Sequence, residues 1–352
     1  MDVRDTPEQA EIRRTARQLA RRLGPRTVSD LDDGLRTKQL AKAVRGAGWL
    51  ELRHEGDDGA PVASGVEAAI IADALAGAVA DVAFAGPVLA ADLARRAGCS
   101  PTDGGVIAFS PDLIDAAVVA GPVTMTPIYA VDCAANIQSP ACVLVPDVGG
   151  YCLARIRIEA AEDEVGNKGT DLTRRVRPIP AGTPVVRVPE QRRILTRDDL
   201  ASWTALGLAL TSADLFGLMR GVLDVTVAYA AERRQFGVPV GSFQAVQHLL
   251  AEARCLMEGS FSVALHASWA VDNLAPDDAR AAGRVAKAYC ARAARTVCES
   301  AVQVHGGMGN TWDCMVHVYL RRALLSSRWF GDDGEQLRQL QPTRLGVSDG
   351  LS

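Results

Sequence analysis

The sequence has few lysines, no long apolar segment and no long run of basic residues. Only four of its 352 residues are lysine, so nearly all of its positive charge is arginine. The formal net charge is −4 at pH 7. A chain with this charge lacks the electrostatic footprint that nucleic acids or acidic membrane surfaces attract. Neither nucleic acid nor a membrane is therefore an expected partner.

The sequence also lacks the patterns of a signal peptide, a transmembrane helix and a metal site. Its first eight residues do not show a basic segment followed by an apolar one, and no run of 18 apolar residues occurs. The eight cysteines include no C-x-x-C pair and no cluster with histidine at metal-ligand spacing. We therefore expect a cytoplasmic chain with reduced thiols and no metal.

Residues 1–103 are predicted to form an all-α domain. Thr6 and Gln9 have the spacing of a capping box, and Pro7 suits the first position of a helix. Ser64 and Glu67 repeat this signal before an alanine-rich helical pattern. The helices expected in this domain cover about residues 7–23, 36–47, 64–80 and 88–97.

Residues 104–194 lose the helical period and are predicted to form a small β domain. Short apolar runs alternate there with Gly, Pro, Asp and Asn, which are typical turn residues. These runs indicate a small antiparallel sheet or barrel, with a hairpin loop over Glu159–Lys168. The expected strands are Val106–Phe109, Ala116–Ala120, Cys142–Val145, Tyr151–Ile158 and Val185–Val188.

Residues 195–341 return to the helical period, and residues 342–352 are predicted to be a frayed tail. Long apolar patterns with short joins favour an antiparallel four-helix bundle. Ser242 is expected to cap the second of these helices. The four helices are expected at about 196–234, 242–272, 276–304 and 313–329. The fold class is therefore α+β, mainly α, with an all-α domain, a reduced middle β domain and a helical bundle.

Two glycine-containing turns at the ends of the bundle helices are the candidate binding motifs of the sequence. The first lies in Y-A-A-E-R-R-Q-F-G-V-P-V-G-S-F-Q-A-V-Q-H, which covers Tyr229–His248, and the second in Q-V-H-G-G-M-G, which covers Gln303–Gly309. A turn between two helices presents backbone N–H groups and a guanidinium together, which suits a phosphate or pyrophosphate. The two turns together indicate a cofactor site at the ends of a helical bundle.

The domain order and these paired motifs closely resemble the acyl-CoA dehydrogenase family of flavoproteins. The resemblance implies an FAD bound at a subunit interface and held mainly by the neighbouring chain. Arginine supplies charge and a bidentate fork for phosphate, while glycine lets a ligand approach the backbone. The residues that the resemblance implies for binding the pyrophosphate and adenosine are Arg233, Phe236, Gln244, Gln303, Gly306 and Gly307.

The resemblance also implies an α,β-dehydrogenation of an acyl-CoA, but the expected catalytic base is missing. In the family a glutamate removes the α proton while a hydride goes to the flavin. The two positions at which members carry this glutamate fall on Phe330 and Gly207, and neither residue can accept a proton. The family's substrate-holding Asp/Arg pair falls on Ala205 and Leu208. The loop that packs on the flavin ring falls on Val106–Asp112, followed by Leu113 and Ile114, and it lacks the family's Glu and its Gly-Ser-Asp sequence.

Three interpretations remain open. The first is the base-lacking subunit of an actinobacterial heterotetrameric acyl-CoA dehydrogenase of lipid or steroid catabolism, which completes the FAD site of a homologous chain carrying the glutamate. The second is a self-sufficient flavoenzyme, with a displaced base among Asp332, Asp333 and Glu335, or with Asp214 in that role. The third is a non-enzymatic protein that uses the same fold. The sequence keeps the residues implied for binding adenosine and lacks the catalytic base. This combination favours the first interpretation.

Overall fold

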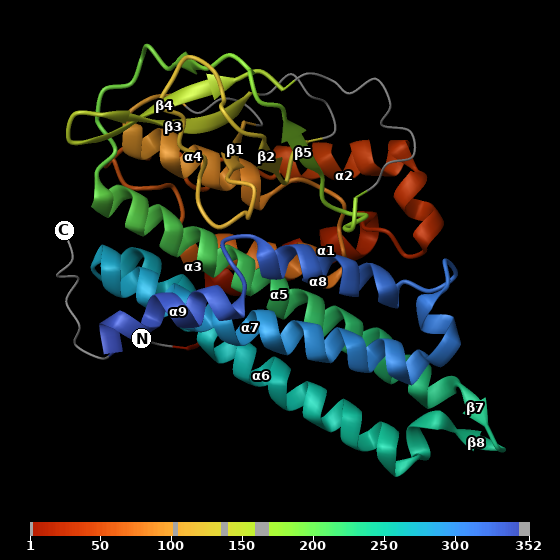
Figure 1. Cartoon of the computed structure of the whole chain (residues 1–352). Coiled ribbons are helices and arrows are strands. Elements are labelled where there is room, and N and C mark those ends of the chain that lie inside the picture. The colour runs from red at the N-terminus through yellow and green to blue at the C-terminus, as the bar shows by residue number, and fades with distance from the viewer. Residues whose placement is uncertain (1–2, 101–104, 135–139, 159–168, 345–352) are drawn as a thin grey trace.

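The computed structural model describes residues 3–100, 105–134, 140–158 and 169–344. Figure 1 shows a small sheet at one side of the molecule, the N-terminal helices beneath it, and long helices that extend away to the hairpin labelled β7 and β8. The predicted loop over Glu159–Lys168 and the predicted tail beyond residue 344 lie outside the described residues.

The N-terminal helices begin at the capping residues that the sequence indicates. Thr6 Oγ1 accepts from Gln9 N at 3.2 Å and Gln9 Oε1 accepts from Thr6 N at 3.1 Å. Ser64 and Glu67 form the second capping box. The helices in this region are α1 (Pro7–Leu23), the 3₁₀ helix η1 (Val28–Asp32), α2 (Gly34–Gly46), α3 (Gly65–Gly77) and α4 (Ala85–Ala97).

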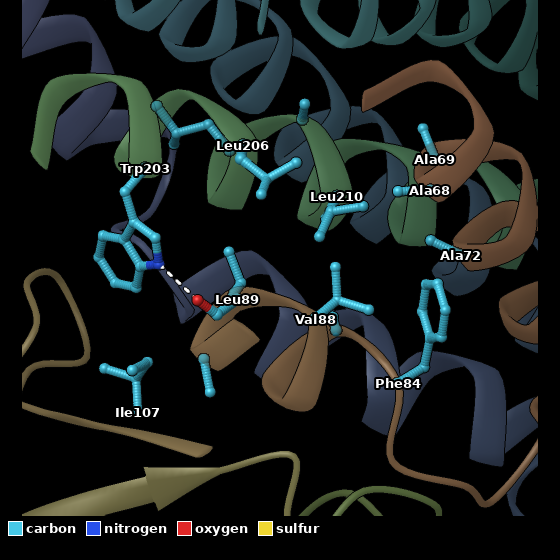
Figure 2. Packing of buried hydrophobic residues seen from close by; sticks show 14 of the residues in the cluster. Ala68, Ala69, Ala72, Phe84, Val88, Leu89, Ile107, Trp203, Leu206 and Leu210 are labelled. Atoms are coloured by element: carbon cyan, nitrogen blue, oxygen red, sulfur yellow. Dashed lines mark hydrogen bonds between the residues drawn. The ribbon is translucent and has the colours of Figure 1, made fainter. Parts of the chain in front are cut away.

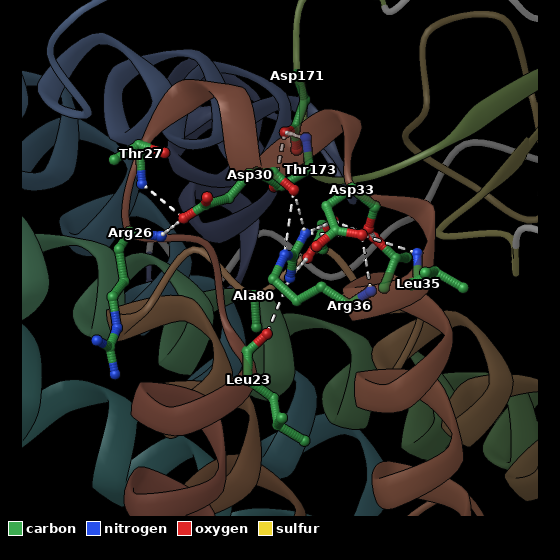
Figure 3. A network of polar contacts seen from close by, with 12 residues as sticks. Leu23, Arg26, Thr27, Asp30, Asp33, Leu35, Arg36, Ala80, Asp171 and Thr173 are labelled. Carbon is green, nitrogen blue, oxygen red and sulfur yellow. Dashed lines mark hydrogen bonds and ion pairs between the residues drawn. The ribbon is translucent and has the colours of Figure 1, made fainter.

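A polar network around Arg36 holds these N-terminal segments together (Figure 3). Its guanidinium donates to both carboxylate oxygens of Asp81, at 2.8 and 2.6 Å. It also donates to the backbone oxygens of Leu23, at the end of α1, and Asp30, in η1. One arginine at the start of α2 therefore fixes the end of α1, η1 and the segment before α4.

The middle region forms one six-stranded sheet in the order β5-β2-β1-β3-β4-β6. β1 pairs with β3 in parallel and the other neighbours are antiparallel, so the prediction of a purely antiparallel sheet was wrong. The predicted strand at 116–120 makes only isolated bridges. The strands are β1 (Val106–Phe109), β2 (Ile128–Val131), β3 (Ala141–Asp147), β4 (Gly150–Ile156), β5 (Val176–Ile179) and β6 (Val186–Arg187).

The sequence pattern missed β2 and β5. Each has four residues, and β5 contains Pro178, which normally argues against a strand. β5 lies at the edge of the sheet, where a proline is tolerated because its missing N–H faces away from the ladder.

The C-terminal region forms the expected helical bundle with one additional helix. Ser242 does not cap the second helix, because its Oγ donates to Pro239 O at 2.7 Å and Phe243 occupies the N-cap position. The additional helix begins at Asp333 and continues into the predicted tail. The bundle helices are α5 (Arg197–Glu232), α6 (Gln244–Asn273), α7 (Pro276–His305), α8 (Val316–Arg328) and α9 (Asp333–Arg344).

Helix α5 is the central element of the core. Trp203 on α5 donates to Leu89 O of α4 at 3.0 Å, and Leu206 and Leu210 belong to the same buried cluster as Val88 of α4 and Ala68 of α3 (Figure 2). Among the described residues α5 is the one helix long and apolar enough to cross a membrane, and 94% of its most apolar window is buried inside the fold. Its apolar character is therefore accounted for by packing within the protein.

Candidate functional site

The first predicted turn is a short β-hairpin that projects from the end of α5. β7 (Arg234–Gln235) and β8 (Val238–Pro239) pair through a two-residue turn. Phe236 and Gly237 have φ of 53° and 82°, which are the positive values of the tight turns that fit hairpins. Phe236 is 93% exposed at the hairpin tip. A phenylalanine held at positive φ in full contact with solvent is unusual for a surface that nothing covers.

The second predicted turn presents open backbone. α7 ends at His305 and the 3₁₀ helix η3 (Gly306–Asn310) follows. Gly306 has φ of 61° and ψ of −142°, a conformation that strongly favours glycine. A Cβ placed on Gly306 or Gly307 would meet no atom within 4 Å of itself. These two residues thus expose backbone that another molecule can approach closely.

A ring stack brings the two turns to the same end of the bundle. The rings of Tyr229, near the end of α5, and His305, at the end of α7, lie 4.1 Å apart with an interplanar angle of 20°. His305 is buried, its Nδ1 lies 2.9 Å from Ala301 O, and burial lowers its pKa. His305 therefore packs into the bundle, whereas the side chains of Arg233, Gln244 and Gln303 are exposed.

This bundle end has the donors that a pyrophosphate requires. Arg233 is exposed, and its guanidinium makes no hydrogen bond or ion pair with any other described residue. Helix α6 starts at Gln244, and no side chain caps its first turn. The first N–H groups of such a helix, with the positive end of its dipole, form a ready anion site. The exposed donors and the open glycine backbone fit the adenosine diphosphate portion of a flavin cofactor.

The two positions expected for the catalytic base lie against each other. Gly207 is in the N-terminal third of α5, and a Cβ built on it would overlap the Cζ atom of Phe330. Phe330 follows α8 and is 2% exposed. The phenyl ring therefore occupies the space that a side chain at position 207 would fill. Neither position offers a proton acceptor.

Phe330 belongs to a cluster of four buried aromatic side chains. Its ring centroid lies 5.1 Å from that of Phe109 and 5.4 Å from that of Trp203. Trp329 completes the cluster, with its ring centroid 5.8 Å from that of Phe330. These side chains come from β1, α5 and the segment after α8. They close the region in which the resemblance places the reacting groups.

The loop after β1 contacts the Phe330 turn directly. Phe330 N donates to Leu113 O at 2.8 Å, and Leu113 and Phe330 both have positive φ, at 61° and 66°. This loop is the segment that the resemblance places beside the flavin ring. In this chain the backbone of the loop is hydrogen-bonded to the turn that contains Phe330, one of the two expected base positions.

The acidic residues considered as displaced bases have structural partners. Asp332 is exposed and its Oδ1 accepts from Glu335 N at 2.9 Å, so it caps α9. Glu335 is buried, accepts from Gln339 Nε2 at 2.7 Å and pairs with Arg338. Asp333 begins α9. These residues therefore belong to the start of a helix.

Asp214 lies in a buried ionic cluster that the sequence pattern did not reveal. Its Oδ1 accepts from Arg174 at 3.0 Å and from Arg322 at 2.6 Å, and its Oδ2 accepts from Ser326 at 2.7 Å. Burial alone would raise the pKa of Asp214, but the two guanidinium groups hold it well below its ordinary value. A carboxylate with so low a pKa is a poor base. The sequence offered one signal for this cluster: Asp214 is an acidic residue within an otherwise apolar stretch of the predicted long helix.

Comparison with known proteins agrees with this architecture. Residues 206–343 match the family model described as acyl-CoA dehydrogenase, C-terminal domain. The chain is 33% identical over 208 residues to acyl-CoA dehydrogenase FadE34 of Mycobacterium tuberculosis, a match that covers 58% of this chain and 28% of that protein. The match thus spans well under half the length of this relative.

Two solved structures share the fold over nearly the whole chain. The ChsE4-ChsE5 complex from Mycobacterium tuberculosis aligns with a TM-score of 0.73 and 22% identity, covering 99% of this chain and 100% of that one. A steroid acyl-CoA dehydrogenase, Tcur3481-Tcur3483, aligns with a TM-score of 0.73 and 20% identity, covering 97% and 99%. At these identities the likeness establishes the fold.

Residues 206–343 thus match the C-terminal domain of acyl-CoA dehydrogenases, and the whole chain shares the fold of these solved structures. The resemblance and the mainly α fold class predicted from the sequence are both confirmed. FAD, the predicted cofactor, agrees with the family, and another protein of this fold, PigA, was solved with FAD and proline (TM-score 0.69, 17% identity, 99% and 100% coverage).

Proposed function

We propose that this chain is the non-catalytic subunit of a heteromeric, FAD-dependent acyl-CoA dehydrogenase. The homologous partner supplies the catalytic glutamate and the contacts to the flavin ring. This chain supplies Arg233, Phe236, Gln244 and the Gln303–Gly307 turn to the adenosine and pyrophosphate end of the same FAD. The complex removes hydrogens from the α and β carbons of an acyl-CoA thioester, and the likeness to a steroid acyl-CoA dehydrogenase favours a steroid-derived acyl group. We place the complex in the cytoplasm.

The observation that carries this proposal is the contact between Phe330 and Gly207. A chain that performed the chemistry itself would need a carboxylate near one of these positions. Both are closed by an aromatic cluster, whereas the predicted adenosine-side residues remain exposed at the other end of α5. One chain therefore combines a closed reaction site with an open cofactor-binding surface.

The exposed apolar side chains near the glycine turns support a partner chain at this surface. Phe236 is 93% exposed and Trp312, which follows η3, is 62% exposed. Met308 in η3 and Phe243 before α6 are also exposed. Aromatic residues and methionine are enriched at protein interfaces, and a large contiguous group of exposed apolar side chains is uncommon on the surface of a monomer.

Co-expression with a homologous acyl-CoA dehydrogenase chain that carries the catalytic glutamate tests this proposal. The chain purified alone is expected to be colourless, because its own flavin-ring contacts are missing. After co-expression, the two chains are expected to elute together and to show the visible absorbance of oxidised flavin. A chain that binds FAD and oxidises acyl-CoA when purified alone would overturn the proposal.

The second interpretation, a displaced base, has a separate test. Replacing Asp332 and Asp333 together with asparagine is expected to leave turnover of the complex unchanged, since Asp332 caps α9 and Asp333 begins it. A loss of turnover above tenfold, with unchanged flavin content, would favour a self-sufficient enzyme. If neither a flavin nor a partner chain is found, a non-enzymatic role is favoured.

A further inference from the structure

Phe330 is held in place by more contacts than a space-filling residue requires. Its backbone has φ of 66°, in the left-handed region that non-glycine residues rarely adopt. Its N–H donates to Leu113 O at 2.8 Å, and its carbonyl accepts from Gln336 Nε2 at 2.6 Å. The next residue, Gly331, also has positive φ, at 86°. A backbone in this region persists because the surrounding structure fixes it.

Gly207, which faces the Phe330 ring, is a position where the packing requires glycine. Gly207 lies inside α5, where glycine destabilises a helix relative to alanine. Even a methyl group at this position would overlap the Phe330 ring. The glycine is therefore the counterpart of the ring, and the two residues form one packing unit across α5 and the turn after α8.

We propose that Phe330, seated against Gly207, is a plug that excludes the acyl group of a thioester from this chain's own cleft. This inference rests on the proposed function, in which only the partner takes the substrate. The plug determines which of two homologous clefts is available. It also accounts for the loss of both base positions together, since an apolar ring in this slot leaves no room for a carboxylate at position 207.

The plug hypothesis requires that removal of the ring leaves a slot for a flat apolar ligand. The walls would be the rings of Phe109, Trp203 and Trp329 with the backbone of α5 at Gly207. A void left by a benzyl group and lined by apolar side chains stays dry and binds small aromatic molecules. Toluene, which matches the missing benzyl group, is the suitable probe.

The test compares thermal unfolding with and without saturating toluene for the wild type, F330A and F330A/G207L. The proteins are used as the complete chain or as its co-expressed complex. Toluene is expected to raise the Tm of F330A by ~2 °C or more and to leave the wild type unchanged. The leucine of F330A/G207L refills the slot from α5, so toluene should lose its effect on this matched control. An equal response of all three proteins, or no response of folded F330A, would overturn the proposal.

A second pair of variants keeps the proposal testable if F330A does not fold. G207A is expected to lower the Tm of the wild type by ~2 °C or more, because the new methyl group overlaps the ring. In an F330L background the same change should have little effect, since the shorter side chain yields. Equal losses in both backgrounds would show that the two positions do not form one unit. None of these readouts involves flavin, so the flavin absorbance of the complex still decides the proposed function separately.

Discussion

Replacing Asp214 with alanine is expected to lower the free energy of unfolding by ~3–5 kcal/mol, the range seen when one partner of a buried ion pair is removed. Asp214 is buried on α5 and accepts from the guanidinium groups of Arg174 and Arg322. Both arginines are buried too, so the change removes the carboxylate that pairs with Arg322 and leaves Arg174 with Asp132 alone. The effect should be among the largest of any single substitution in the chain.

Denaturant unfolding of D214A and of a control, D224A, measures this loss. Asp224 lies on the same helix but is exposed, so its removal should change stability by less than ~0.5 kcal/mol. A loss below ~1 kcal/mol for D214A would mean that the cluster relaxes or hydrates and does not anchor α5.

The same cluster predicts part of the acid sensitivity. The pKa of Asp214 is depressed in the folded chain, so its contribution to stability is complete above the pKa of the unfolded carboxyl, ~4, and is lost as the pH falls further. D214N should remove this part of the pH dependence. The stability difference between wild type and D214N is therefore expected to shrink between pH 5 and pH 3.

Replacing Arg233 with alanine is expected to weaken FAD binding by the complex ~10–100-fold. Arg233 directly follows α5, and its side chain is exposed. Its backbone is fixed by hydrogen bonds from Arg233 N to Tyr229 O and from Val240 N to Arg233 O. A hydrogen bond to a charged group contributes ~1.5–3 kcal/mol, which corresponds to this range of affinity.

The neighbouring Arg234 is the matched control. It is also exposed, it lies in β7, and its Nη1 is 3.4 Å from Gly237 O within the same hairpin. R234A should change the Kd for FAD by less than threefold, as measured by flavin fluorescence on the co-expressed complex. Equal effects of R233A and R234A would indicate a general loss of positive charge, and an unchanged Kd for R233A would remove this residue from the site.

Local signals were sufficient to predict much of the helical framework. The capping boxes at Thr6, Ser64 and Thr196 involve residues three apart, so their donors and acceptors can be read directly from the sequence. The two turns could be located because their glycines and proline interrupt the helical pattern, but the β7–β8 hairpin of the first turn was not predicted. Their roles toward FAD remain predictions.

Contacts between distant segments could not be predicted from local patterns. α4 starts three residues earlier than expected because the carboxylate of Asp132, at the end of β2, accepts from the N–H groups of Phe84 and Gly86. The contact between Gly207 and Phe330 likewise joins separate elements. The sequence shows that neither residue can act as a base. The structure adds that the Phe330 ring fills the space that a side chain at position 207 would need, so residue 207 has to be glycine.

Native mass spectrometry of the co-expressed complex tests the central claim most directly, because it counts FAD against chains. We expect one FAD for each pair of unlike chains, and none on this chain purified alone. One FAD for each chain, or a homo-oligomer of this chain with a full complement of FAD, would contradict it. In that case this chain would have to form a complete flavin site even though the loop expected beside the flavin ring is hydrogen-bonded to Phe330 through Leu113.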